Sequence, residues 1–153
     1  MARITETLEV ELPADEVFDL VADFSNTGTW DPGIRSARRL DPEAAALGLG
    51  SRFELLADLK VVTPPLVYEV TTFERPRRVV LETSSLLVRG EDDVTVEPIS
   101  DTRSRVVWRA EFALRGPGVL LDPLLAPGFR WVGAQAVQGL TEWLQGKARE
   151  RAA

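Results

Sequence analysis

LPADEVFDLVADFSNTGTWDPGI, residues 12–34, separates one predicted strand from a long run of others. Pro13 ends the first strand, and the two acidic residues that follow favour the first turn of a helix. Apolar residues then recur at helical spacing over residues 17–24. The polar residues 25–28 end this helix and cap a second, very short helix that leads into Trp30. The stretch therefore predicts two short helices directly after the first strand.

Trp30 lies where the sequence otherwise has the composition of a loop. A surface turn gains nothing from so large an apolar side chain. Two interpretations remain open: the loop folds back so that Trp30 seals the core, or Trp30 belongs to a binding site.

Alternation of apolar and polar residues predicts strands on both sides of these helices. Residues 4–12 alternate apart from Glu6, which falls on the apolar face. After the helices, six strands are predicted near residues 34–40, 51–60, 66–74, 78–88, 93–99 and 104–114. One of the turns between them is Gly90–Asp92, and the acidic run Glu91–Asp93 is interpreted as a solvated hairpin tip. Consecutive strands without intervening helices predict an antiparallel meander.

The last part of the chain predicts a long helix. Gly116–Gly118 ends the sheet, and Asp122 followed by Pro123 is typical of an N-cap and a first helical position. We expect a short helical lead-in and an interruption near Pro127–Gly128, because proline lacks the N–H that a helix interior uses. One helix then continues to about residue 150, with an apolar stripe that can face a sheet.

The composition fits one domain over residues 1–153 and excludes several kinds of site. Lys plus Arg number 18 and Asp plus Glu 24, a net charge of −6 that disfavours general binding to nucleic acid or to an anionic membrane. The absence of cysteine excludes disulfides and zinc–thiolate sites, and the absence of histidine removes the commonest general base. With no signal peptide or membrane span in the sequence, we predict a soluble, cytoplasmic protein without integral membrane contact.

The order of the elements resembles the helix-grip fold of the START-like superfamily, also called SRPBCC, and within it the polyketide cyclase/dehydrase and lipid-transport group. Residues 12–34, YEVTTFERPRRVVLE at 68–82 and TRSRVVWRAEF at 102–112 carry the resemblance, which covers nearly the whole chain. It implies an α+β fold in which a seven-stranded curved antiparallel sheet wraps around a long C-terminal helix, with two short helices after strand 1. It also implies an apolar cavity between sheet and helix, with Trp30 as a wall at its end.

We expect a hydrophobic ligand in this cavity, lined by the inward residues of the strands and of the helix. The candidate ligand-binding residues are Trp30, Phe53, Leu55, Tyr68, Leu81, Thr83, Val96, Trp108, Phe112, Phe129, Val132 and Ala136. Gly133 and Gly139 either leave room for the ligand or let helix and sheet pack closely, and at Gly139 we expect close packing.

No catalytic residue, metal site or cofactor is predicted. Glu6 is the one carboxylate that falls on the apolar face of a predicted strand. Its position near the N-terminus, however, favours a place at the edge of the sheet. Arg109 and Glu111 face outward if Trp108 points inward. We therefore predict that no titratable pair faces the cavity within hydrogen-bonding reach.

The leading hypothesis is binding or transport of a hydrophobic small molecule, such as a polyketide, an isoprenoid or a lipid, by a protein that is not an enzyme. The alternative is a polyketide cyclase- or aromatase-like enzyme that folds its substrate by proximity. A third hypothesis is a protein-interaction role, as in ribosome-associated or toxin-like members of the superfamily.

Overall fold

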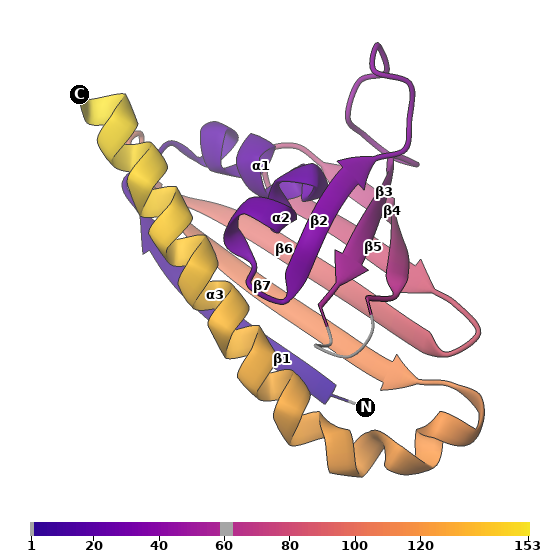
Figure 1. The fold of residues 1–153 in the computed structure, drawn as a ribbon. Coiled ribbons are helices and arrows are strands. Elements are labelled where there is room, and N and C mark those ends of the chain that lie inside the picture. The colour runs from indigo at the N-terminus through magenta and orange to yellow at the C-terminus, as the bar shows by residue number, and fades with distance from the viewer. Residues whose placement is uncertain (1, 59–62) are drawn as a thin grey trace.

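One antiparallel sheet of seven strands, in the order β1-β7-β6-β5-β4-β3-β2, curves around the helices (Figure 1). The structure is a computed structural model that describes residues 2–58 and 63–153, without the side chains of Asp122 and Ala126. The described elements are β1 (Ala2–Val10), α1 (Ala14–Ala22), η1 (Phe24–Asn26), α2 (Thr27–Trp30), β2 (Ile34–Arg39), β3 (Arg52–Ala57), β4 (Pro65–Glu74), β5 (Arg78–Ser84), β6 (Val88–Ser100), β7 (Arg103–Leu114), η2 (Gly116–Leu121) and α3 (Asp122–Ala152). The expected α+β helix-grip fold is confirmed. The end of the predicted strand 51–60 and Lys60 lie outside the described residues. None of the helices in the described ranges has the length and apolar character to span a membrane.

The turn between β5 and β6 lies at residues 85–87, so the hairpin tip predicted within residues 90–93 is wrong. The Ser85 hydroxyl accepts a hydrogen bond from the N–H of Val88 (3.1 Å), and the N–H of Ser85 donates to the carbonyl of Val88 (2.8 Å). A serine side chain thus closes the β5–β6 turn, whereas the sequence predicted a turn at Gly90. The acidic run consequently lies inside β6.

Helix α3 runs without a break from Asp122 to Ala152, so the predicted interruption near Pro127–Gly128 is also wrong. Its N-cap is Leu121, one residue before the predicted cap. Pro127 removes only the bond that its N–H would make to the carbonyl of Pro123. This end of α3 is exposed, so water can solvate that carbonyl, and the φ angle of proline suits a helix.

The core lies between the concave face of the sheet and the short helices, and Phe24 is at its centre. The Phe24 ring stacks on the Trp108 ring at 5.9 Å and lies 5.5 Å from the Tyr68 ring and 6.2 Å from the Phe53 ring. Such aromatic pairs contribute beyond the apolar area they bury. They fix η1 and the start of α2 against the sheet.

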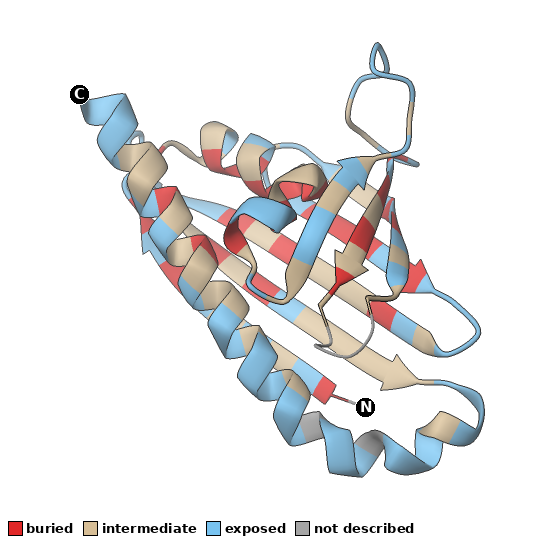
Figure 2. Ribbon diagram, in the orientation of Figure 1, coloured by how far each residue is buried: buried red, intermediate tan, exposed pale blue. Residues whose placement is uncertain are grey.

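Burial is uneven along α3 (Figure 2). Leu140 and Leu144, one turn apart in the C-terminal half, are fully buried, whereas most of the N-terminal half is exposed. Two glycines let the helix approach closely. A Cβ on Gly139 would overlap the carbonyl oxygen of Trp30, and a Cβ on Gly133 would overlap the side chain of Ile4. Close packing at Gly139 is confirmed, and at Gly133 the space is filled by Ile4.

Gly139→Ala is expected to lower the free energy of unfolding by about 1–3 kcal/mol, because α3 has to move away from Trp30. Gly146→Ala in the same helix is the control, since the nearest atom to its Cβ would be a guanidinium nitrogen of Arg149 at 3.9 Å. That control is expected to be neutral or to stabilise by up to about 1 kcal/mol, because alanine is the better helix former. Urea unfolding followed by circular dichroism measures both variants, and equal effects would contradict the close approach.

Candidate functional site

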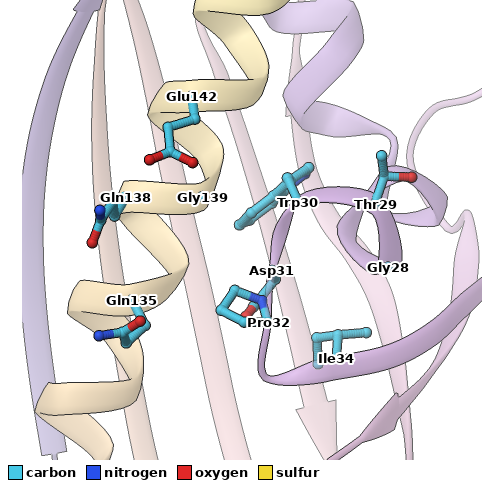
Figure 3. Close-up of a pocket in the computed structure, with 10 residues that line it drawn as sticks. All are labelled: Gly28, Thr29, Trp30, Asp31, Pro32, Ile34, Gln135, Gln138, Gly139 and Glu142. Atoms are coloured by element: carbon cyan, nitrogen blue, oxygen red, sulfur yellow. The ribbon is translucent and has the colours of Figure 1, made fainter.

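A groove of about 440 Å³ lies between α3 and the segment that joins α2 to β2 (Figure 3). Residues from 28–34 form one wall, and Gln135, Gln138, Gly139 and Glu142 form the other. The groove is open to solvent, and polar residues of α3 line one side of it.

Trp30 separates this groove from the core. It is 8% exposed, and its ring meets the Trp108 ring edge-on with the centroids 5.5 Å apart. Its main chain contacts α3 at Gly139. Trp30 therefore seals the core and lines the groove, and that it belongs to a binding site stays a prediction.

Asp31 follows α2 and begins the Asp-Pro-Gly turn. Its N–H closes the helix on the carbonyl of Thr27 (2.9 Å), and its Oδ1 accepts a hydrogen bond from the N–H of Gly33 (2.7 Å). Burial raises the pKa of Asp31, and the hydrogen bond from Gly33 opposes the rise. The turn thus holds a carboxyl group against the interior.

Asp92 lies within β6 and is largely enclosed by protein, with partial exposure to solvent. Its carboxylate accepts a 2.7 Å hydrogen bond from Nε1 of Trp108. Burial raises the pKa of Asp92 to about 6, with the Trp108 hydrogen bond opposing the rise and the charge of Asp31 adding to it. A carboxyl group with this pKa changes its charge just below neutral pH.

Tyr68 of β4 is the second hydrogen-bonding neighbour of Asp92. Burial raises the pKa of Tyr68 well above its usual value, and the charges of Asp92 and Asp31 add to the rise. The phenol therefore stays protonated and can donate a hydrogen bond. We call Asp31, Tyr68, Asp92 and Trp108 the inner polar cluster. Asp31 also lines the groove, so it joins the cluster to the surface.

The prediction that no titratable pair faces the cavity within hydrogen-bonding reach stays a prediction. Inside the fold, however, Asp92 and Tyr68 lie within hydrogen-bonding reach of each other, and the sequence analysis did not find this pair. The reason is the turn at residues 85–87, which places Asp92 within a strand. A signal was present in the sequence. Counting back by twos from the buried Val96 and Val94 leads to Asp92 as the next inward residue.

The other charged candidates lie elsewhere. Glu6 is half-buried and stands opposite Trp108 in the register of β1 and β7. Arg109 is exposed, and Glu111 pairs with Arg3 at 3.0 Å, which agrees with the outward orientation expected for both. In residues 2–58 and 63–153, no three acidic side chains come together in a way that could hold a metal ion.

The predicted cavity residues differ in their surroundings. Those buried on the strands are Phe53, Leu55, Tyr68, Leu81, Thr83, Val96 and Trp108. Phe112 stacks on Phe129 of α3 at 5.7 Å, and Ala136 packs half-buried against the core. Val132 is exposed and approaches the turn at Gly33. That these residues bind a ligand stays a prediction.

A family model described as polyketide cyclase / dehydrase and lipid transport matches residues 1–145. The chain belongs to this family. No curated protein matches the sequence.

Solved structures with this fold include a START superfamily protein from Mycobacterium smegmatis, with 13% identity, a TM-score of 0.74 and coverage of 98% of this chain and 99% of that chain. The Zhui aromatase/cyclase from Streptomyces sp. R1128 has 16% identity, a TM-score of 0.75 and coverage of 99% and 95%. A protein from Thermus thermophilus has 17% identity, a TM-score of 0.75 and coverage of 95% and 98%. At these identities, the likeness shows that this member of the polyketide cyclase / dehydrase and lipid transport family shares their fold.

Asp92→Asn is expected to change how stability depends on pH. Folding raises the pKa of Asp92 from 3.8 to about 6, so between these values the folded protein holds more protons than the unfolded chain. Through this group, the free energy of unfolding falls as the pH rises from about 4 to about 6. Asparagine does not titrate, so the free energy of unfolding of the variant is expected to lack this part of its decrease with pH.

Urea unfolding at a series of pH values measures the effect as the difference between the wild type and the variant. Asp93→Asn is the matched control, because Asp93 is the next residue of β6 and pairs with Arg78 at 3.0 Å on the outer face. In Asp93→Asn, the free energy of unfolding is expected to decrease over the same pH range as in the wild type. An unchanged pH dependence in Asp92→Asn would contradict the buried environment of this carboxyl group.

Proposed function

We propose that the chain binds an apolar small molecule between the concave face of the sheet and α3, next to the groove at Trp30. The observation that carries the proposal is the inner polar cluster, in which two carboxyl groups and one phenol lie beside buried aromatic side chains. Ligand sites typically combine an apolar lining with a few polar groups that orient the ligand. The family description and the names of two structural neighbours, a START superfamily protein and an aromatase/cyclase, support the same role.

The cluster also indicates the chemistry of the ligand. Near neutral pH the Asp92 carboxylate accepts hydrogen bonds from Trp108 and Tyr68 and has oxygen lone pairs left for a further donor, and the Tyr68 hydroxyl oxygen can also accept. A ligand that carries hydroxyl groups on an apolar chain or ring can donate to these oxygens. A polyketide fits this description better than a pure hydrocarbon does.

A cyclase- or dehydratase-like enzyme is a second candidate function, and the pKa of Asp92, about 6, favours it. Such a group can give and take a proton at the pH of a cell. In a dehydration, the protonated Asp92 would donate its proton to a leaving hydroxyl as the C–O bond breaks. The carboxylate would then recover a proton from the neighbouring carbon as the double bond forms.

Ala136→Trp is expected to weaken the binding of an apolar fluorescent dye about tenfold or more, since the half-buried Ala136 faces the core and the indole fills the space for the ligand. Ala134→Trp is the control, because Ala134 is exposed on the same helix. Dye titration measures binding, and thermal unfolding confirms that both variants fold. Dye binding at wild-type strength in Ala136→Trp would place the site elsewhere.

Native mass spectrometry separates the two candidate functions. If the chain is a binder, the wild type and Asp92→Asn are expected to retain the same small molecule. If it is a dehydratase, the species retained by Asp92→Asn is heavier by one water than the species retained by the wild type. Protein that retains no small molecule in either form, even at low salt and under gentle ionisation, would count against both.

A further inference from the structure

Large apolar side chains gather without cover at one end of the molecule. Leu86, at the tip of the β5–β6 turn, is 92% exposed, Leu120 of η2 is 83% exposed, and Leu124 at the start of α3 is 77% exposed. Their neighbours Leu87, Val119, Leu121 and Leu125 are exposed as well. We call these seven residues the leucine end. Exposed apolar patches of this kind usually mark a contact with another molecule.

Arg115 holds the two segments of the leucine end together. Its N–H donates to the carbonyl of Leu87 (2.8 Å), and its guanidinium donates to Oγ of Ser84 (2.7 Å) and to the carbonyl of Ser85 (3.0 Å). The β5–β6 turn and the start of η2 therefore lie side by side, as their positions in Figure 1 also show. In Figure 2 both segments are largely exposed. The leucines thus form one surface, although they come from segments that are distant in the sequence.

The charge of this end is opposite to that of the rest of the chain. Residues 84–90 and 113–134 contain three arginines, Arg89, Arg115 and Arg130, and a single acidic residue, Asp122. The chain as a whole has a net charge of −6, so the remaining residues carry all of the excess negative charge. A basic and apolar end on an acidic protein attracts an anionic surface and orients the molecule toward it.

We propose that the leucine end docks on the surface of a lipid bilayer that contains anionic lipids. Arginines beside exposed leucines are suited to such an interface, since the leucines enter its apolar layer while the arginines contact the head groups. Trp131, which is 66% exposed two turns further along α3, is of the residue type enriched at the boundary between membrane and water. A second copy of the chain is a poorer occupant, because a symmetric contact would bring the two basic ends together. The docking is peripheral, and it does not rest on the proposed ligand site.

The test is flotation of the purified chain with vesicles of phosphatidylcholine alone and with vesicles in which phosphatidylglycerol replaces about a third of it. The wild type is expected to float with the anionic vesicles and to dissociate at high salt. The triple variant Leu86→Ser, Leu120→Ser, Leu124→Ser is expected to reduce the bound fraction about tenfold. Arg89→Gln together with Arg130→Gln is expected to remove the preference for anionic vesicles.

Leu49→Ser is the matched control, because Leu49 is 73% exposed in the loop between β2 and β3, at the other end of the molecule (Figure 1). It is expected to float like the wild type. Dye binding in solution is expected to be unchanged in the triple variant, so failure of docking and failure of ligand binding are distinguishable. The proposal is overturned if the wild type floats with neither kind of vesicle, or if the triple variant floats as well as Leu49→Ser. It is also overturned if sedimentation shows a dimer that the triple variant dissociates while vesicles bind neither protein, since a second copy then covers the leucines.

Discussion

The hydrogen bond from Nε1 of Trp108 to the Asp92 carboxylate is the interaction on which the arrangement of the interior depends. A carboxyl group and an indole N–H on a buried sheet face both need a partner, and here each satisfies the other. Asp92 stands opposite Ala110 and Trp108 opposite Val94, so the two are diagonal neighbours on adjacent strands. A slip of β6 by one residue would turn Asp92 outward and leave the indole without this acceptor.

The same tryptophan connects the sheet to the helices. Its ring packs on Phe24 and on Trp30, and the carbonyl of Trp30 in turn lies against α3 at Gly139. The inner polar cluster, the aromatic core and the surface groove are therefore parts of one connected set of contacts. A change in the charge of Asp92 therefore acts directly on Trp108, the residue that joins the sheet to the helices.

The two halves of helix α3 contribute differently to the structure. The C-terminal half supplies Leu140 and Leu144 to the core and stabilises the fold. The N-terminal half contacts the sheet at Gly133 and through the stack of Phe129 on Phe112, and it leaves Leu124 and Trp131 exposed. A helix that is anchored at one end in this way can offer its other end to a ligand or to a membrane surface without unfolding the core.

The sequence by itself determined the order of the elements, the antiparallel meander, the long last helix and the inward position of most strand residues. Alternation and helical spacing are local properties, and they were sufficient to find Phe53, Leu81 and Trp108 as buried residues. Local rules failed at residues 85–93, where a glycine next to acidic residues was interpreted as a turn and a serine closes the actual one. Only the tertiary structure decided that the charges of Asp31, from a turn, and Asp92, from a distant strand, both act on Tyr68, and that Asp92 accepts a hydrogen bond from Trp108. The choice of hydrogen-bond partners depends on how separate segments pack, and no spacing within one segment carries that information.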